Sequence, residues 1–309
     1  MTLPANDFAR YERPWTLPEL IDRKDGRGVS VVLPALNEEN TVAGVIESIR
    51  PLLGGLVDEI LVVDSGSTDR TRARARGAGA RVYTLDEALP GLPSRPGKGE
   101  VLWRSLAVAG GDLIVFIDSD LVAPDPKFVP ALVAPLLFED HLRLVKGCYR
   151  RALHNDSVYD RDGGGRVTQL VARPLLAALA PALAELAQPL GGEYAATRGL
   201  LTSIPFAPGY GVEIGILIDC WRRHGLCSIT EVDLGARVHR NRPIPELAAM
   251  SRQVIATLLH RLDIPDSGAP LPQFERAGSN RRRFLSEVGP ADRPPMATVA
   301  NRPIASLAL

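Results

Sequence analysis

The feature that most constrains the fold is an apolar run within residues 112–120 that ends in two carboxylates. The run extends from Leu113 to Ile117 and predicts a buried central strand. Asp118 and Asp120 follow it at positions i and i+2, so on an extended backbone their side chains point the same way. Such a pair could share one Mg²⁺ or Mn²⁺ ion with a diphosphate, because these cations prefer hard oxygen ligands. An acidic turn after a strand is the alternative, and an isolated Asp-x-Asp favours it.

Strand and helix patterns alternate along the first half of the chain. Val29–Pro34 and Glu59–Val63 are apolar runs typical of buried strands, and Val42–Ile49 has the spacing of an amphipathic helix. Further strands are predicted at 81–84, 142–146 and 228–234, and further helices at 70–76, 100–109, 168–186, 209–223 and 246–262. This order predicts an α/β fold in which helices cover both faces of a mostly parallel sheet.

Polar residues follow three of the predicted strands where each strand ends. Ligands of parallel sheets bind beyond the carboxyl ends of the strands, so these residues should converge on one ligand site. The three clusters are Asn37 with Glu38, Asp64 with Ser65, and Asp118 with Asp120.

The composition indicates a globular protein with no formal net charge. The 309 residues are 45% hydrophobic, which supports a sizeable core, and Lys+Arg and Asp+Glu both total 36. We therefore expect neither nucleic-acid nor membrane-surface binding, and any anion must be bound locally. Three cysteines, no signal-peptide pattern and no apolar stretch near 18 residues lead us to expect a cytoplasmic protein without a membrane span.

Two common nucleotide-binding motifs are absent from the first half. Arg95–Gly99 resembles a P-loop, but Gly99 stands where Ser or Thr is required and the spacing from Gly91 is one residue too long. Residues 34–39, Pro-Ala-Leu-Asn-Glu-Glu, replace the Gly-x-Gly-x-x-Gly of dinucleotide-binding enzymes. An ATPase and a dehydrogenase are therefore disfavoured, and the acidic loop suits a base or ribose better than a bare pyrophosphate.

Three features of the second half could bind ligands, and each has a simpler explanation. Gly163–Thr168 combines glycines, a helix start and Arg166, which favours a phosphate or carboxylate site over a plain helix-initiating turn. His239 would bind metal only if its strand ends near Asp118 and Asp120; otherwise it is an ordinary histidine. Glu213 could bind or deprotonate a hydroxyl, or merely stabilise the dipole of its helix.

Several of these segments together resemble a known family. Residues 31–38, 63–69 and 118–120 resemble the nucleotide-sugar half of GT-A glycosyltransferases. The segments 95–104, 163–168, 208–215 and 238–243 are similar to one retaining family, the actinobacterial glucosyl-3-phosphoglycerate synthases of glycosyltransferase family 81. The resemblance covers roughly residues 12–265.

This resemblance implies a GT-A fold and a metal-dependent reaction. Glucose would pass from UDP-glucose to 3-phospho-D-glycerate, giving glucosyl-3-phosphoglycerate and UDP, the first step toward methylglucose lipopolysaccharide or glucosylglycerate. The cofactor would be Mg²⁺ or Mn²⁺, and the enzyme a homodimer. The chain would divide into an N-terminal arm (1–28), a nucleotide-sugar-binding half (29–120), an acceptor-binding half of the same domain (121–245), and a C-terminal helix with an extended tail (246–309).

The resemblance also implies roles for individual residues. The nucleotide-sugar residues would be Pro34, Ala35, Leu36, Glu38, Ser65, Lys98, Asp118, Ser119 and Asp120. Asp120 and His239 would bind the metal, and Gly165, Arg166, Thr168 and Asn241 would bind the acceptor. Glu213, Asp120 and Lys98 would be the catalytic residues.

Three other functions remain open at this point. A mannosyl-3-phosphoglycerate synthase using GDP-mannose would need the same motifs, because the sugar's stereochemistry is read by pocket details that the sequence does not reveal. A sugar-phosphate nucleotidyltransferase is less favoured, since residues 34–39 lack a glycine-rich loop with a catalytic Arg or Lys. A non-catalytic sensor of nucleotide sugars would keep the fold for binding alone.

Overall fold

The computed structural model describes residues 10–122, 124–155, 158–160, 165–239, 243–277 and 280–299. Within these ranges the side chains of residues 150–155, 158–160, 236–239, 277 and 280 are not described.

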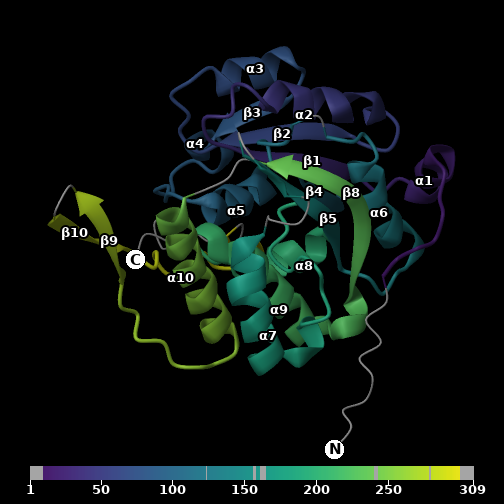
Figure 1. Cartoon of the computed structure of the whole chain (residues 1–309). Helices are drawn as coiled ribbons and strands as arrows, with labels where there is room; N and C mark the ends of the chain where they lie inside the picture. Colours follow the sequence, from purple (N-terminus) through teal and green to yellow (C-terminus); the bar gives the residue numbers. More distant parts are fainter. Residues whose placement is uncertain are drawn as a thin grey trace, which may run out of the picture.

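One large mixed sheet organises the body of the protein (Figure 1). Its strands follow the order β3-β2-β1-β4-β7-β5-β6, and β8 pairs with β5. β1, β2, β3 and β4 are mutually parallel, β8 is parallel to β5, and β7 runs antiparallel to both β4 and β5. The strands are β1 Val29–Ala35, β2 Glu59–Asp64, β3 Arg81–Thr84, β4 Leu113–Phe116, β5 Leu144–Asn155, β6 Val158–Asp160, β7 Tyr194–Thr197 and β8 Ile229–His239.

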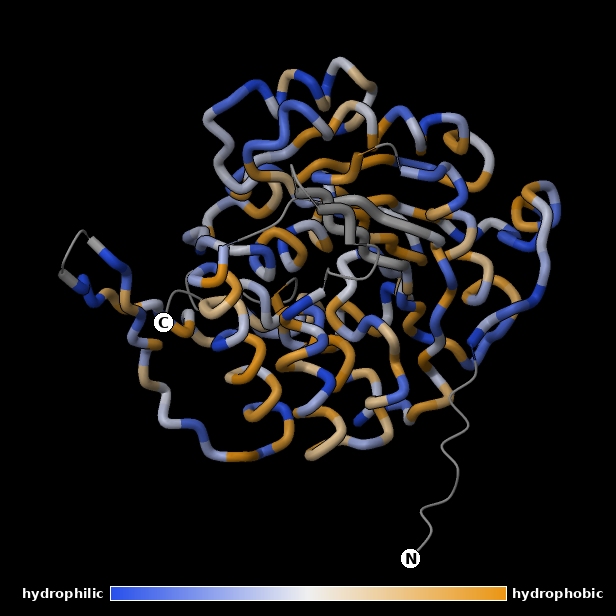
Figure 2. The backbone as a smooth tube through the Cα atoms, viewed as in Figure 1, coloured by the Kyte–Doolittle hydropathy of each residue, from blue (hydrophilic) through white to orange (hydrophobic). Residues whose placement is uncertain are grey.

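Helices pack on both faces of this sheet, as the sequence predicts. Val31 and Leu33 of β1 contribute to one core cluster with α1, α2, α3 and α6, whereas Val32 points into a second cluster with α5 and α7 to α11. In Figure 2 hydrophobic stretches, drawn in orange, lie both in strands of the upper part of the molecule and in the helices below them. The helices are α1 Leu17–Lys24, α2 Val42–Ile49, α3 Thr71–Gly77, α4 Leu85–Ala88, α5 Lys98–Val108, α6 Phe128–Phe138, α7 Arg173–Leu179, α8 Arg198–Ser203, α9 Val212–His224, α10 Ile244–Arg261 and α11 Met296–Val299.

The structure differs from the predicted elements in several places. The single helix predicted over 168–186 is a π-helical turn at Thr168–Ala172, then α7, then a 3₁₀ turn at Pro181–Leu183. The helix breaks there because Pro181 has no N–H and restricts the residue before it. The expected N-terminal arm contains α1, which buries Leu20 in the core. The structure also contains β7 and α6, for which the sequence analysis made no prediction.

The C-terminal tail is more structured than the extended tail that the sequence led us to expect. β9 (Leu271–Ala277) and β10 (Asn280–Ser286) form an antiparallel hairpin that projects from the body (Figure 1). After the hairpin the chain returns to the body, where Met296 and Val299 of α11 are buried. Apolar side chains in an otherwise polar and Pro-rich segment account for this docking.

No described helix is both long enough and apolar enough to cross a membrane.

Candidate active site

The carboxyl ends of β1, β2 and β4 meet at one edge of the sheet. Ala35 pairs with Asp64 in the parallel register, and the Ser65 N–H donates to the Ala35 carbonyl at 2.9 Å. The Ser119 hydroxyl donates to the Pro34 carbonyl at 2.6 Å. The structure therefore brings together these four residues of the predicted nucleotide-sugar group: Pro34, Ala35, Ser65 and Ser119.

Hydrogen bonds join the loop after β1 to the loop after β2. Asn37 has a left-handed backbone with φ of 56°; its N–H donates to the Ser67 hydroxyl at 2.8 Å and its side-chain oxygen accepts from the Thr68 N–H at 2.9 Å. The Glu38 N–H donates to the Thr71 hydroxyl at 2.7 Å. Leu36 is 53% exposed between these fixed points. These hydrogen bonds fix the backbone of the loop, which presents the apolar side chain of Leu36 at the edge of the sheet.

Asp64 offers an acceptor at the same edge. Its carboxylate is buried, and Oδ2 accepts from the N–H groups of Gly66 and Ser67 at 3.2 and 3.0 Å. Oδ1 is buried and has no hydrogen-bond partner among the described residues. A buried acceptor without a donor is costly, so Oδ1 suits an N–H group of a ligand.

Lys98 links two carboxylates from opposite parts of the chain. Its Nζ lies 2.6 Å from Asp118 Oδ1 and 2.8 Å from Glu213 Oε1. Burial alone would lower the pKa of Lys98, but the Asp118 and Glu213 carboxylates outweigh it and hold this pKa well above its ordinary value. Lys98 is therefore a fixed cation at neutral pH, and the cluster joins three residues of the predicted site.

Close backbone packing brings this cluster together. Lys98 begins α5, and a Cβ at the next residue, Gly99, would overlap the carbonyl oxygen of Ala207. Residue 207 precedes the glycine turn that leads into α9, where Glu213 is buried in the first turn. On the other side, a Cβ at Gly192 would overlap the carboxylate of Asp118. Larger residues at these positions would separate the charged groups.

Asp120 could supply one carboxylate ligand to a hard divalent cation. Asp120 is half-buried two residues after Asp118, whose Oδ1 lies 2.6 Å from Lys98 Nζ. No group of three or more His, Cys, Asp or Glu side chains that could hold a metal occurs in the described part of the chain. Asp120 would therefore need further ligands, and phosphate oxygens are suitable. His239 ends β8, and its side chain is not described.

The predicted acceptor turn begins a helical segment, as its glycines suggested. Gly165 has a φ of +75°, and its carbonyl accepts from the Gln169 N–H at 2.9 Å. Arg166 is half-buried and Thr168 is buried in the π-helical turn. Such turns are frequent at functional sites. Gly163 and Gly164 of this turn lie outside the described residues, as does Asn241, the fourth predicted acceptor residue.

Two buried polar residues near the Lys98 cluster, Lys146 and Tyr194, were not predicted. Lys146 is 1% exposed, donates from Nζ to the Gly191 carbonyl at 2.6 Å, and lies 4.5 Å from the centre of the Tyr194 ring. The Tyr194 hydroxyl is buried without a hydrogen-bond partner in the described residues. Burial and the nearby Glu213 carboxylate raise the pKa of Tyr194 well above its ordinary value. A lysine ending the apolar strand predicted at 142–146 was the signal available in the sequence.

Lys146 should make stability depend on pH. Burial lowers its pKa from 10.5 to about 8, against the opposing effect of Glu213. Between these values the unfolded chain binds more protons than the folded one, so folding stability contributed by this group rises with pH. We expect the free energy of unfolding of the wild type to rise relative to Lys146→Met by about 2 kcal/mol from pH 7 to pH 10. Urea unfolding of both proteins across this range tests it, and parallel curves would contradict it.

The sheet order and the Asp-x-Asp site at its edge define a GT-A glycosyltransferase, and comparisons with known proteins agree. The model of the family described as glycosyl transferase family 2 matches residues 30–163. A glucosyl-3-phosphoglycerate synthase of Mycolicibacterium smegmatis is 61% identical over 293 residues, which are 94% of this chain and 97% of that protein. The chain belongs to the glucosyl-3-phosphoglycerate synthase family.

Solved structures of that family have the same fold. The Mycobacterium tuberculosis enzyme in complex with Mn²⁺, UDP-glucose and phosphoglyceric acid matches with a TM-score of 0.86 and 58% identity, covering 94% of this chain and 98% of that one. The same enzyme with Mg²⁺ and UDP matches with a TM-score of 0.88 and 58% identity, covering 94% and 99%.

Proposed function

We propose that the protein transfers glucose from UDP-glucose to 3-phospho-D-glycerate, giving glucosyl-3-phosphoglycerate and UDP, with Mg²⁺ or Mn²⁺ as cofactor. The observation that carries this proposal is Lys98, a buried cation held between Asp118 and Glu213 at the edge of the sheet. A fixed positive charge at this place suits a reaction in which negative charge develops on a departing diphosphate. Membership of the synthase family supports the choice of both substrates.

The loops after β1 and β2 suit the uridine. Leu36 offers an apolar surface to the flat base, and Asp64 Oδ1 is an unsatisfied acceptor suited to the N–H of uracil. Ser65 and the backbone of Pro34 and Ala35 lie beside them. Glu38 would accept hydrogen bonds from ribose hydroxyls.

The diphosphate would lie between Lys98 and the metal. Asp120 and His239 would hold the cation, whose charge stabilises the β-phosphate of the departing UDP. Lys98 adds a second positive charge that is already oriented by Asp118 before the substrate arrives. Lys98 Nζ lies 2.8 Å from Oε1 of Glu213, and the Glu213 carboxylate would accept a hydrogen bond from a sugar hydroxyl or from the attacking hydroxyl.

The acceptor carries a phosphate and a carboxylate, and the turn at Gly165 suits such anions. Backbone N–H groups at a helix start and the fork of the Arg166 guanidinium match these groups, with Thr168 and Asn241 as further members.

We expect Arg166→Met to raise the KM for 3-phosphoglycerate about tenfold or more while the KM for UDP-glucose changes less than twofold. Initial rates with each substrate varied in turn test this. Equal increases in both KM values would refute the acceptor role.

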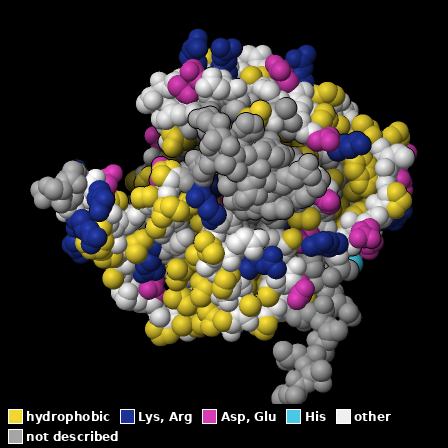
Figure 3. Space-filling model, in the orientation of Figure 1, with side chains coloured by type: hydrophobic (Ala, Val, Ile, Leu, Met, Phe, Trp, Pro, Cys, Tyr) yellow, Lys and Arg dark blue, Asp and Glu magenta, His cyan; other side chains and the backbone are white. Residues whose placement is uncertain are grey.

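We further propose a homodimer that works in the cytoplasm. A two-stranded hairpin is marginally stable alone, yet β9 and β10 project from the body, and Phe274 and Leu285 on them are exposed. Figure 3 shows the hairpin at the left, with several Lys or Arg side chains on it. Packing against a second copy would cover these two side chains, Phe274 and Leu285. Light scattering should give twice the chain mass in solution, and Phe274→Asp should shift it toward the monomer. A monomeric wild type would reject the dimer.

The donor is tested by a panel of nucleotide sugars with 3-phosphoglycerate and Mg²⁺. We expect fastest nucleotide release from UDP-glucose. Faster turnover of GDP-mannose would indicate a mannosyltransferase, and release of pyrophosphate would indicate a nucleotidyltransferase. Tight UDP binding without any turnover would indicate a sensor.

A further inference from the structure

The returning C-terminal segment, residues 290–299, contacts both stretches of chain that position the Lys98 cluster. The Arg293 N–H donates to the Phe206 carbonyl at 2.9 Å, and the Phe206 N–H donates back to the Arg293 carbonyl at 3.0 Å. The Trp103 indole of α5 donates to the Pro294 carbonyl at 2.8 Å. One side of the segment is therefore bonded to α5, and the other to the chain seven residues before Glu213.

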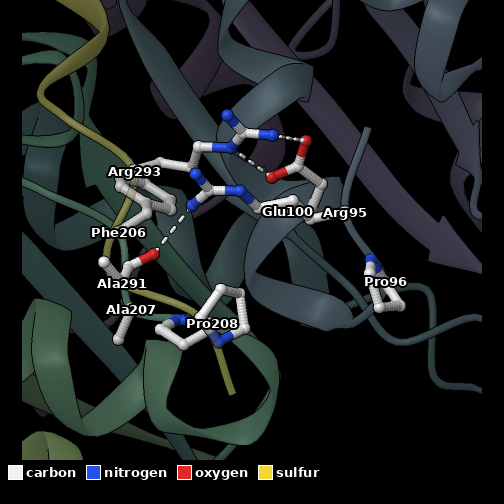
Figure 4. A pocket seen from close by; sticks show the side chains of 9 residues that line it. Arg95, Pro96, Glu100, Phe206, Ala207, Pro208, Ala291 and Arg293 are labelled. Atoms are coloured by element: carbon white, nitrogen blue, oxygen red, sulfur yellow. Dashed lines mark hydrogen bonds and ion pairs between the residues drawn. The ribbon is translucent and has the colours of Figure 1, made fainter. Parts of the chain in front are cut away.

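The side chain of Arg293 strengthens this connection (Figure 4). Its Nε and Nη2 lie 2.6 and 2.8 Å from the two carboxylate oxygens of Glu100, and Nη2 also donates to the Pro93 carbonyl at 2.7 Å. Arg104 donates to the same carboxylate at 2.6 Å. These three charged side chains are buried, with exposures of 6%, 3% and 0% for Arg293, Glu100 and Arg104. A buried bidentate pair of this kind fixes orientation as well as distance.

The position of Glu100 makes this pair relevant to the active site. Glu100 lies two residues after Lys98 in the first turn of α5, and Gly99 between them packs on the Ala207 carbonyl. Arg293 thus holds the first turn of α5 with its side chain and the residue before Ala207 with its backbone. These are the stretches that set the distance between Lys98 and Glu213.

We propose that Arg293 is a positioning residue, which fixes Lys98 relative to Glu213 from the far end of the chain. It touches neither carboxylate partner of Lys98 and acts through Glu100 and the backbone of α5. This inference rests on the proposed function, because it gives Lys98 its role at the diphosphate. Misplacement of a catalytic group by about 1 Å can cost up to about 10²-fold in rate, so a distant contact can matter for turnover.

A double-mutant cycle separates positioning from general stabilisation. We expect Arg293→Met to lower kcat about tenfold or more, and to weaken binding of UDP with Mg²⁺. In a Lys98→Met background, Arg293→Met should change kcat and the dissociation constant of UDP by less than a further twofold, because the side chain that Arg293 positions is gone. Glu100→Gln, which keeps the shape of the side chain, should act in the same direction. All assays are run well below each variant's melting temperature.

Arg81→Met, at an exposed arginine, is the control for the loss of an arginine–glutamate pair away from the site. Arg81 pairs with Glu59 at 2.8 Å on the exposed side of β3, so its loss should leave kcat unchanged. The positioning role would be overturned if Arg293→Met lowered kcat and UDP binding by the same factor in the wild-type and Lys98→Met backgrounds. A kcat for Arg293→Met within twofold of the wild type would also overturn it. The wild type in the same assay tests the proposed function separately. If the wild type binds UDP but forms no product, UDP binding to the single and double variants of Arg293 and Lys98 still decides the role of Arg293. A wild type that does not bind UDP would overturn both.

Discussion

Lys98→Met is expected to lower kcat by about 10³-fold. Removing one group that stabilises developing charge typically costs about 10²- to 10³-fold, and here the charge is buried and prearranged. The change also leaves the carboxylates of Asp118 and Glu213 close together without their shared cation. The negative charges of both carboxylates would repel the diphosphate. Release of UDP under saturating substrates measures the effect.

Lys24→Met provides the matched control. Lys24 is likewise a largely buried lysine, with its Nζ 2.7 Å from Asp58 Oδ1, but it lies in α1. This change should lower the melting temperature and leave kcat within twofold. A Lys98→Met enzyme that keeps more than a tenth of the wild-type kcat would show that Lys98 is not the charge at the leaving group.

Asp120→Asn is expected to reduce turnover by about 10³-fold, as is removal of the metal from the wild type with EDTA. An amide is a weaker ligand than a carboxylate for Mg²⁺ or Mn²⁺, so the substitution should act by weakening the metal site. Mn²⁺ binding in the presence of UDP, followed by electron paramagnetic resonance, gives a readout independent of activity. The dissociation constant should rise at least about tenfold.

Asp125→Asn is the control for this change. Asp125 is exposed five residues further along, where its Oδ1 accepts from the Lys127 N–H at 2.8 Å. It should bind Mn²⁺ and turn over as the wild type does. Full activity of Asp120→Asn, or wild-type turnover that survives EDTA, would remove Asp120 and the metal from the mechanism.

The parts of the fold that could be predicted are those with a local signal. β1, β2 and β4 are buried on both faces and therefore carry continuous apolar runs, which the sequence reveals. β7 has four residues and is fixed by antiparallel pairing with β4 and β5, partners distant in the sequence. α6 contains Pro130 and Pro135, which argue locally against a helix, yet burial of its apolar side chains outweighs them.

Only some of the contacts in the candidate site could be predicted from the sequence. Asn37, Asp64 and Asp118 could be placed together because parallel strands end at one edge of the sheet. The contact between Lys98 and Glu213 depends on the packing of Gly99 against Ala207, for which a single sequence has no signal. Arg293 stands in a polar, Pro-rich tail, and its partner Glu100 is 193 residues away. Such long-range pairs emerge only from the folded structure.

The proposed function is tested most directly by the product formed from UDP-¹³C-glucose, 3-phosphoglycerate and Mg²⁺. Mass spectrometry and NMR should identify a labelled glucosyl-3-phosphoglycerate in equal amount to the UDP released, and neither should form without the protein or the metal. UDP release with free glucose as the labelled product, or a glycoside formed from GDP-mannose but not from UDP-glucose, would contradict the proposed reaction.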